Sequence, residues 1–227
     1  MTLSSGWKWC HLSLSNTNYL VNNYDKIANQ YDFLSRLVFF KSQVKAQIDQ
    51  LKYIPDNSTI LIAGGGTGWI LKEIAKIKPI GLHIVYVEIS QKMITLSKSR
   101  FVGDNKVEFI HLGIEDFNTD HVFDVILTPF LFDNFGEDRA EKVFDFLDSI
   151  LKKSGLWLFV DFSLDPKNGR WWKLLILKSM YTFFKVIGIV ETNRLIDIHQ
   201  MFKRKAYLML EQQFYYGNFI SATVYKK

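Results

Sequence analysis

Short apolar runs recur along the chain and are separated by stretches with helical spacing. Runs with little alternation lie at 59–63, 82–88, 122–128 and 156–162, and a shorter alternating run lies at 106–111. Apolar runs of this length are typical of strands that are covered on both faces of a parallel sheet. Because these runs alternate with helical segments, the pattern predicts βαβ units and an α/β fold.

Capping residues and helix breakers set the expected bounds of the helices between these strands. A first helix is predicted over 68–78 and a second over 91–101, with Ser90 as the N-cap of the second. A longer helix is predicted over 137–153, where Gly155 ends it.

The C-terminal part departs from this plain alternation. Residues 192–206 have helical spacing, and two further strands are predicted over 208–216 and 219–226. Gly217 and Asn218 between these strands form a hairpin signal. The chain is therefore expected to end in an antiparallel hairpin.

The run at 59–63 leads directly into a glycine-rich turn, in which Gly64, Gly66 and Gly68 occupy alternate positions. Glycine at these positions permits positive φ angles and lets the backbone approach a ligand closely. Free N–H groups at the start of the following helix can then meet an anion. The alternative is a turn that only links a strand to a helix.

An acid stands at the end of the next strand. Glu88 lies 20 residues after Gly68, where a carboxylate can accept hydrogen bonds from a ribose diol. The spacing G-x-G-x-G differs from the dinucleotide fingerprint G-x-G-x-x-G, whose last position falls on Trp69, and a P-loop would require a Gly-Lys-Ser/Thr ending. The spacing therefore counts against an NAD oxidoreductase and against a P-loop enzyme.

The segments IAGGGTG and VYVEIS together resemble the class I S-adenosylmethionine-dependent methyltransferases. The best match is the small-molecule branch that includes the ubiquinone/menaquinone-biosynthesis methyltransferases. The Y-D-x-x-A-x-x-Y-D opening of that branch is matched here by Tyr24, Asp25, Ala28, Tyr31 and Asp32. The resemblance covers residues 24–165. It implies a doubly wound, mostly parallel seven-stranded sheet with helices on both faces and a C-terminal antiparallel hairpin.

The resemblance also implies S-adenosylmethionine as the cofactor and a set of residues that bind it. Glu88 would hold the ribose, Ile89 would pack on the adenine, and Ile114 would reach the adenine through its backbone N–H. Tyr24 and Tyr31 would belong to a lid, although both could equally be core aromatics of an N-terminal helix. The predicted cofactor-binding residues are Tyr24, Tyr31, Ala63, Gly64, Gly66, Thr67, Gly68, Glu88, Ile89, Ile114, Glu115 and Thr128.

Two positions depart from the family pattern. Ile62 stands where the family often has an acid, two residues before the first glycine of the turn. Leu112 and Gly113 stand where a Gly-Asp pair often meets the adenine amine. Both losses weaken cofactor binding in principle.

Methyl transfer from a sulfonium needs mainly alignment, and a base helps only when the acceptor must lose a proton. Asp133, just past the fourth strand, is the candidate catalytic residue, and the alternative is a helix N-cap or a solvated loop carboxylate. His199 is a second candidate, against the alternative of an ordinary surface or core histidine. The five histidines show no metal-binding spacing, so no metal is expected.

Composition narrows the class of partner. The chain has 227 residues, 15% aromatic residues and a net charge of +5. This length suits one α/β domain, and the aromatic share could fill a core or line a site for an apolar substrate. The scattered basic excess does not indicate nucleic-acid binding. Cys10 is the single cysteine, and without a signal-peptide pattern or a long apolar run we expect a cytoplasmic protein.

We expect a single methyltransferase domain over 1–227. Its parts are an N-terminal arm with lid helices (1–54), a cofactor-binding core (55–165), and acceptor-side helices with the closing hairpin (166–227). The stretch 169–190 is rich in aromatic residues with lysines between them. It suggests a wall or lid for a lipophilic acceptor, with a weak contact to the inner membrane surface, or equally a packed core helix. The oligomeric state is left open.

The predicted function is S-adenosylmethionine-dependent methyl transfer to a small acceptor, apolar or aromatic, of a quinone-like or lipid-like kind. O-, N- and C-methylation are not distinguished. The two missing acids keep an alternative open, a non-catalytic S-adenosylmethionine-binding or regulatory module with the same fold.

Overall fold

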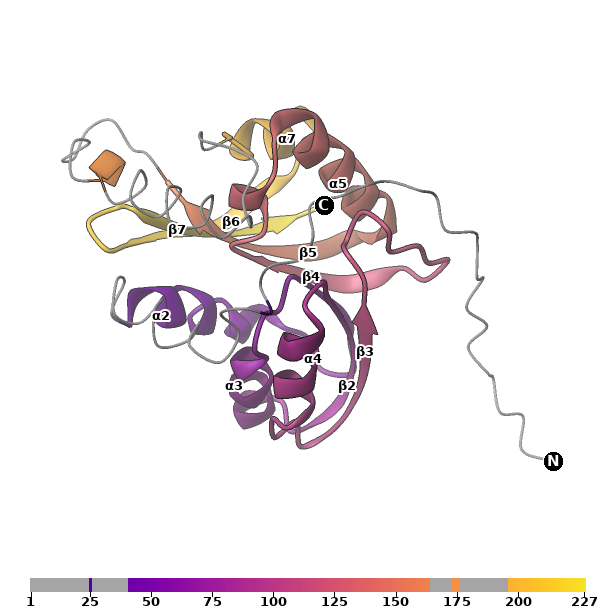
Figure 1. Ribbon diagram of the computed structural model, residues 1–227. Coiled ribbons are helices and arrows are strands. Elements are labelled where there is room, and N and C mark those ends of the chain that lie inside the picture. The colour runs from indigo at the N-terminus through magenta and orange to yellow at the C-terminus, as the bar shows by residue number, and fades with distance from the viewer. Residues whose placement is uncertain (1–24, 26–40, 164–172, 176–195) are drawn as a thin grey trace.

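The computed structural model describes residues 25, 41–163, 173–175 and 196–227, which form a seven-stranded sheet with helices on both faces (Figure 1). The strands are β1 (Thr59–Ala63), β2 (Ile80–Glu88), β3 (Asp104–His111), β4 (Phe123–Pro129), β5 (Leu151–Phe162), β6 (Leu208–Tyr215) and β7 (Ile220–Lys226). Their order is β3-β2-β1-β4-β5-β7-β6, in which β7 is antiparallel to β5 and β6 and the other pairs are parallel. The predicted fold class, a doubly wound and mostly parallel sheet with a closing antiparallel hairpin, is confirmed.

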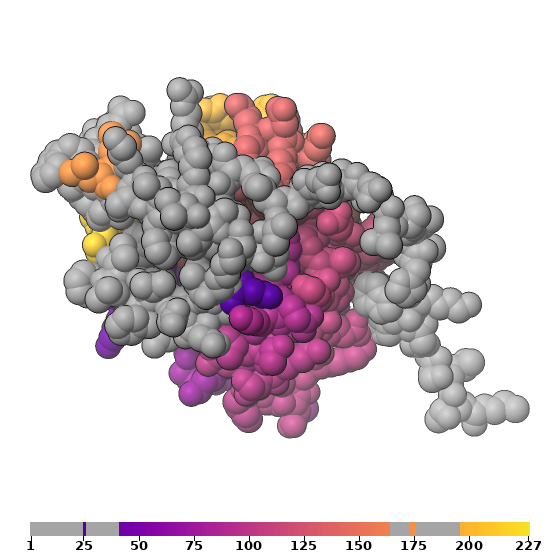
Figure 2. Space-filling model, viewed as in Figure 1, coloured from indigo at the N-terminus to yellow at the C-terminus, as the bar shows by residue number. Residues whose placement is uncertain are grey.

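The helices divide between the two faces of the sheet. They are α2 (Ser42–Ile48), α3 (Trp69–Ile77), α4 (Gln91–Lys98), α5 (Glu137–Ile150) and α7 (His199–Arg204), with the short 3-10 helices η2 (Leu51–Tyr53) and η3 (Phe132–Asn134). Helices α2, α3 and α4 lie on one face, and α5 and α7 lie on the other (Figure 1). In the space-filling view of Figure 2, purple and magenta atoms lie in the lower part, and salmon and yellow atoms lie in the upper part. The described residues therefore contain a hydrophobic core on each side of the sheet.

Strand β1 is apolar throughout because both of its faces are buried. Ile60 and Ile62 share a core with residues of α3, and Leu61 and Ala63 share the opposite core with residues of α5. All four side chains are fully buried. Because successive residues of a strand point to opposite faces, a strand that is covered on both sides needs an apolar residue at every position.

The long helix predicted over 137–153 is shorter in the structure, so this expectation was wrong at its C-terminal end. Helix α5 ends at Ile150, and β5 begins at Leu151 instead of residue 156. Leu151 pairs with Phe123 of β4, and the register shifts just beyond this pair. Pairing with a distant strand has overridden the local helical pattern.

Several expectations fall outside the described residues. Tyr24 and Tyr31 lie there, as does most of the stretch 169–190. The Ser90 cap is confirmed, because its side-chain oxygen accepts a hydrogen bond from the Met93 N–H at 3.2 Å. Among the helices of the described ranges, none is long and apolar enough to cross a membrane.

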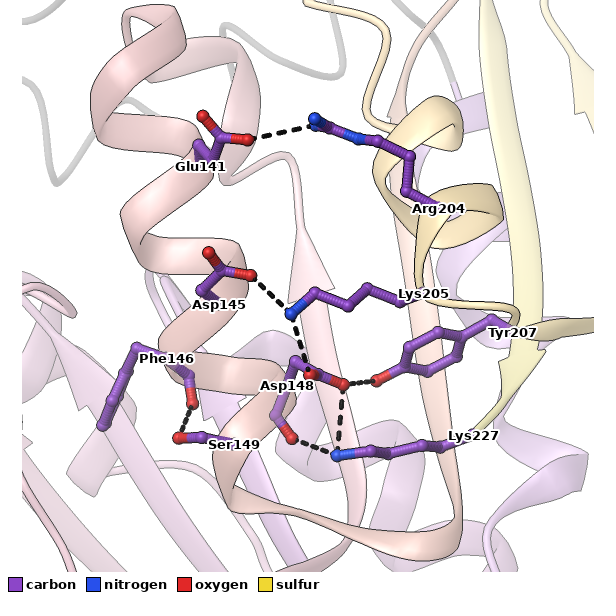
Figure 3. Close-up of polar contacts among 9 residues, drawn as sticks. All are labelled: Glu141, Asp145, Phe146, Asp148, Ser149, Arg204, Lys205, Tyr207 and Lys227. Atoms are coloured by element: carbon purple, nitrogen blue, oxygen red, sulfur yellow. Dashed lines mark hydrogen bonds and ion pairs between the residues drawn. The ribbon is translucent and has the colours of Figure 1, made fainter.

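Acidic side chains on α5 fix the segment after α7 and the last residue of the chain to this helix (Figure 3). Asp148 accepts a hydrogen bond from the Tyr207 hydroxyl at 2.7 Å and forms ion pairs with Lys205 at 3.5 Å and Lys227 at 3.1 Å. Asp145, one turn earlier, pairs with Lys205 at 2.8 Å. Asp148 therefore joins three segments that are distant in sequence.

Asp148→Asn is expected to lower the free energy of unfolding by about 1–2 kcal/mol near neutral pH. Burial raises the pKa of Asp148, but the Tyr207 hydroxyl, Lys227 and Lys205 outweigh this effect, so the net pKa lies below its ordinary value. Such a carboxyl stabilises the folded state above its unfolded pKa, and the contribution is lost as the pH falls through the folded pKa. In urea unfolding, the difference between wild type and variant should therefore shrink in acid.

Asp145→Asn is the matched control for this experiment. The side chains of Asp145 and Lys205 are 55% and 43% exposed, so we expect a change below about 0.5 kcal/mol. Equal stability of the wild type and Asp148→Asn near neutral pH would contradict the structural role of Asp148.

Candidate active site

The carboxyl ends of β1, β2, β4 and β5 lie at one edge of the sheet, and the strand order reverses between β1 and β4. In open α/β sheets, ligands bind at such a switch point, outside the carboxyl ends of the strands. The glycine turn follows β1, Glu88 ends β2, and η3 follows β4. The predicted turn and the predicted acid therefore meet at this edge.

The three glycines of the predicted turn share a left-handed backbone but differ in their surroundings. Their φ angles are 70° at Gly64, 64° at Gly66 and 75° at Gly68. A Cβ added at Gly68 would lie 2.4 Å from the Ser97 Cβ of α4, whereas a Cβ at Gly66 would meet no atom of the described residues within 4 Å. Gly68 therefore serves the packing of α3 against α4, and Gly66 leaves its backbone open to a ligand.

Gly65, which the sequence analysis did not single out, is constrained by the strand beside it. A Cβ at Gly65 would lie 2.2 Å from the Tyr86 ring. The Tyr86 hydroxyl donates to the Gly66 carbonyl oxygen at 2.9 Å, and Arg100 Nε donates to the Thr67 carbonyl oxygen at 2.9 Å. These bonds fix the carbonyl groups of the turn. The sequence signal for Gly65 was its place as the middle one of three consecutive glycines.

Glu88 is buried and bound to the turn. Its Oε2 accepts a hydrogen bond from the Gly66 N–H at 2.9 Å, and its Oε1 accepts one from the Ser90 N–H at 2.8 Å. Burial raises the pKa of Glu88, and the N–H groups of Ser90, Gly66 and Ile89 partly offset this effect. These three N–H groups occupy three of the four lone pairs of the carboxylate, so the group can still accept a hydrogen bond from a hydroxyl.

Asp25 brings one residue of the N-terminal Y-D motif to the same edge. Its Oδ1 accepts hydrogen bonds from the Ser90 hydroxyl at 2.5 Å and from the Lys92 N–H at 3.2 Å. On the other side of this loop, His111 Nε2 lies 3.0 Å from the carbonyl oxygen of Ile89. The loop after β2 is therefore held by both Asp25 and the end of β3.

The loop after β3 places Ile114 in the core and ties Glu115 to α5. Ile114 is buried. Glu115 forms an ion pair with Arg139, whose guanidinium lies 4.6 Å from the centre of the Phe135 ring. A Cβ at Gly113 would lie 3.2 Å from the Glu115 carboxylate, which gives a physical reason for glycine at this position. The Glu115 carboxylate is thus engaged within the protein.

Two predicted cofactor-binding residues at strand ends have buried side chains. The Thr128 hydroxyl accepts a hydrogen bond from the Trp157 Nε1–H at 2.9 Å. Ala63 packs in the core on the α5 side, and Ile62 packs in the core on the α3 side. Thr128 and Ala63 can therefore contact a ligand only through their backbone atoms. Ile62, at the position where the family often has an acid, is a core residue here.

Two carboxyl groups lie at the ends of β4 and β5. Asp133, the candidate base, is on η3, and its Oδ1 accepts a hydrogen bond from the Asn134 side-chain amide at 2.8 Å. Asp161 is on β5 and 5% exposed, and its Oδ1 accepts one from the Phe162 N–H at 2.8 Å. Burial, and then the charge of Asp161, raises the pKa of Asp133 well above its ordinary value, and burial raises the pKa of Asp161 to about 7.

Asp161 was missed by the sequence analysis. A signal was present, because it is the one acid in the apolar run LWLFVDF, much as Glu88 is the acid that ends the run LHIVYVE. A carboxylate near the carboxyl end of a buried strand points to a site at that edge of the sheet.

The same two strand ends carry an aromatic pair. The rings of Phe130 and Phe162 are 5.0 Å apart, and the Phe162 ring is 5.1 Å from that of Phe219. Phe130 has a φ of 51°, a left-handed conformation that is uncommon for a bulky residue. The Asn134 side-chain amide donates to the Phe130 carbonyl oxygen at 3.0 Å. Strain of this kind persists only where the surroundings hold it, and it clusters at ligand sites.

His199, the second candidate base, packs in the core on the α5 side. Its ring lies edge-on to Phe159 with centroids 5.5 Å apart, and its Nδ1 is hydrogen-bonded to the Tyr225 hydroxyl. Burial lowers the pKa of His199. These contacts fit the interpretation as an ordinary core histidine. In the part of the chain that the structure describes, no group of three His, Cys, Asp or Glu side chains is arranged to hold a metal ion.

Comparison with known proteins agrees with this geometry. Residues 60–155 match the family model described as a methyltransferase domain. A ubiquinone/menaquinone biosynthesis C-methyltransferase, UbiE, of Geotalea daltonii is 28% identical over 176 residues, which cover 74% of this chain and 71% of the relative.

Solved structures show the same fold. A methyltransferase from Aquifex aeolicus described as SAM-dependent has a TM-score of 0.60 at 14% identity, covering 89% of this chain and 97% of that chain. The 1,6-didemethyltoxoflavin-N1-methyltransferase of Burkholderia thailandensis has a TM-score of 0.61 at 11% identity, covering 94% and 93%.

The strand order, the antiparallel closing hairpin and the glycine turn bonded to an acidic strand end agree with the methyltransferase-domain match over residues 60–155, and make the chain similar to the class I methyltransferases, the enzymes that use S-adenosylmethionine. Within this class, the chain is similar to the ubiquinone/menaquinone branch. The expected resemblance and the expected class of enzyme are confirmed.

Proposed function

We propose that the chain binds S-adenosylmethionine between the glycine turn and Glu88 and transfers its methyl group to a small, quinone-like aromatic acceptor. The observation that carries this proposal is the pair of hydrogen bonds from the Gly66 and Ser90 N–H groups to the Glu88 carboxylate. These bonds join the turn and the acid into one unit at the switch point of the sheet.

The turn and the acid fit different parts of this cofactor. The backbone at Gly66 is left-handed and open, so the amino-acid part of the cofactor can approach it closely. The remaining lone pair of the Glu88 carboxylate suits a hydroxyl of the ribose. We assign the adenine contacts to Ile89, which follows Glu88, and to the buried Ile114 in the loop after β3.

When bound, the cofactor supplies a methyl group on a sulfonium, which needs little further activation. The task of the chain is to align an acceptor with this methyl group, because proximity and orientation supply much of the rate. Glu88 and the turn occupy the ends of β1 and β2. The ends of β4 and β5 are therefore left for the acceptor.

The acceptor side favours a flat apolar molecule. Phe130 and Phe162 are partly exposed and form a ring pair, and such aromatic surfaces stack well on flat rings. The UbiE relative, at 28% identity, is named for C-methylation in ubiquinone and menaquinone biosynthesis. Both observations support a quinone-like acceptor over a lipid-like one.

We assign the whole chain to a single domain, in which residues 1–54 form an arm and lid and 166–227 form the acceptor side. The contacts of Asp25 with the loop after β2 support the lid, because Asp25 belongs to the same motif as Tyr24 and Tyr31. A cytoplasmic location and a weak membrane contact of the stretch 169–190 stay predictions.

Glu115 and Thr128 take a different part in this proposal. Their side chains are engaged with Arg139 and Trp157, so we assign them to shaping the loop after β3 and the end of β4. The Glu115 carboxylate is engaged in an ion pair, and the buried Ile62 replaces an acid that the family often has. Both observations favour a second candidate function. This is a non-catalytic module that binds the cofactor without transfer.

Incubation with methyl-labelled S-adenosylmethionine and a panel of acceptors tests the proposal. The panel is 1,4-naphthohydroquinone, catechol, a fatty acid and a reaction without acceptor. We expect label in the hydroquinone. Label only in the fatty acid would contradict the quinone-like acceptor, and cofactor binding without label in any acceptor would favour the non-catalytic module.

A further inference from the structure

Asp161 is a buried acid with an incomplete set of hydrogen bonds. Its Oδ1 accepts from the Phe162 N–H, and the N–H groups of Phe132 and Asp133 also act on the carboxylate, but its Oδ2 is buried and has no partner at full hydrogen-bonding geometry among the described residues. A buried polar atom without a partner is costly, so its presence in a folded protein calls for an explanation. A ligand that donates a hydrogen bond to this oxygen would supply one.

A second carboxyl group lies within electrostatic reach. Asp133 is partly exposed, and the charge of Asp161 acts on it. Burial raises the pKa of both groups, and the charge of Asp161 raises that of Asp133 further. The two acids therefore titrate as a pair, and the pair can exchange a proton near neutral pH.

The pair lies beside the turn that we assign to the cofactor. Leu131, two residues before Asp133, packs against this turn, and its Cδ1 would be 3.0 Å from a Cβ at Gly64. Phe130 and Phe162, next to these residues in the chain, form the ring pair at the same strand ends. The two acids are thus near neighbours in the chain both of the residue that packs on the donor turn and of the aromatic pair that we assign to the acceptor.

We propose that the Asp133–Asp161 pair binds a hydroxyl group of the aromatic acceptor and takes up its proton. This inference rests on the proposed function and deepens it, since it makes the acceptor a hydroxylated ring such as a phenol or hydroquinone. Asp133 is the partly exposed member that meets the hydroxyl, and Asp161 contributes the oxygen that lacks a partner.

The chemical step is a proton transfer. The O–H bond of the acceptor breaks, its electron pair stays on the oxygen, and the proton bonds to the ionised carboxylate of the pair. The negative charge on the ring oxygen is shared with neighbouring ring carbons, so both atoms become better methyl acceptors. A base contributes to methyl transfer when the acceptor must lose a proton.

Other titratable groups on this side of the sheet do not take this role. His199 packs against Phe159, two residues before Asp161, and is hydrogen-bonded to Tyr225. Burial lowers the pKa of His199 and raises the pKa of Tyr225, so both are neutral near neutral pH. Lys173 donates to the Asn218 carbonyl oxygen on the closing hairpin at 3.3 Å. The acid pair is therefore the proton acceptor of this proposal.

Binding of two matched probes to the complex with S-adenosylhomocysteine tests the proposal. The probes are 2-naphthol and 2-methoxynaphthalene, which share a ring system but differ in the hydroxyl proton. For the wild type, we expect 2-naphthol to bind about tenfold more tightly at about pH 8, where the pair has an ionised member. As the pH falls and the two acids become protonated, we expect this preference to disappear. Tryptophan fluorescence gives both affinities.

Variants separate this role from a structural one. Asp133→Asn is expected to remove the preference for 2-naphthol at every pH. Asp161→Asn removes the charge that, after burial, raises the pKa of Asp133, so the preference should appear at a lower pH than in the wild type. Asp120→Asn, which changes an exposed acid before β4, is the matched control and should leave the preference unchanged. Circular dichroism and the affinity for S-adenosylhomocysteine show whether each variant is folded. If Asp161→Asn does not fold, the result for Asp133→Asn alone decides the test.

Equal binding of the two probes to the wild type at every pH would overturn the proposal, as would an unchanged preference in Asp133→Asn. If the preference for 2-naphthol has the same pH dependence in Asp161→Asn as in the wild type, Asp161 has no part in the proposed pair. If S-adenosylhomocysteine binds but neither probe does, the aromatic acceptor of the proposed function fails, and this inference fails with it.

Discussion

Gly66→Ala is expected to remove cofactor binding from a protein that still folds. The added Cβ would meet no atom of the described residues within 4 Å, so the folded state bears mainly the strain of a left-handed alanine, about 1–2 kcal/mol. The same Cβ would stand on the open side of the turn, where we place the amino-acid part of the cofactor. We therefore expect the affinity for S-adenosylhomocysteine to fall by more than about tenfold, or about 1.4 kcal/mol.

Gly68→Ala is expected to act in the opposite way, by strongly destabilising the fold. Its Cβ would lie 2.4 Å from the Ser97 Cβ and 2.7 Å from the Ser97 Cα, so the backbone of α4 would have to move. Overpacking costs about 1–3 kcal/mol, and the left-handed φ adds about 1–2 kcal/mol. Together these are a large part of the roughly 5–15 kcal/mol that stabilises a typical domain.

Thermal unfolding and calorimetric titration measure the two effects separately. Gly136→Ala is the control, because Gly136 has an ordinary φ of −73° and a Cβ there would meet no described atom within 4 Å. Because Gly136 is the N-cap of α5, we expect this control to lower the stability by no more than about 1 kcal/mol and to leave the affinity unchanged. Full cofactor affinity in Gly66→Ala would show that the ligand does not use the open side of the turn.

Glu88→Gln is expected to lower the affinity for S-adenosylhomocysteine by about 1.5–3 kcal/mol, or roughly tenfold to a hundredfold. The amide keeps the size of the side chain but removes the charge. Its NH2 group is a donor and not an acceptor, so the amide cannot accept from both the Gly66 and the Ser90 N–H groups. The variant therefore loses one of the hydrogen bonds that hold the turn, and it also loses an acceptor for the ribose.

The pH dependence of the affinity distinguishes these contributions. Burial raises the pKa of Glu88, so the wild type should lose affinity as the pH falls through a range above that of an ordinary glutamate. Glu88→Gln should lack this dependence. A melting temperature without ligand shows whether the variant is folded, and unchanged affinity in a folded variant would remove Glu88 from the cofactor site.

Features that depend on neighbours in the chain could be predicted from the sequence. The apolar run of β1 indicated its burial on both faces, and Ser90 was a correct N-cap because a cap bonds within its own first turn. The glycine turn and Glu88 were recognised from their spacing, and the structure brings them together through the bond between Gly66 and Glu88.

Features that depend on distant partners could not be predicted in this way. The first residues of β5 continue the helical pattern of α5, and only pairing with β4 places Leu151 in a strand. The ion pair of Glu115 with Arg139 joins residues 24 apart in the chain. The interaction of Asp161 with Asp133 likewise depends on the packing of η3 against β5, which no local pattern reveals.

Calorimetric titration of the wild type with S-adenosylhomocysteine, beside a parallel titration with NADH, tests the central claim most directly. The account predicts saturable binding of S-adenosylhomocysteine at one site per chain, and no binding of NADH at the same concentrations. Binding of NADH alone, or no binding of S-adenosylhomocysteine at millimolar concentration by a folded protein, would contradict it.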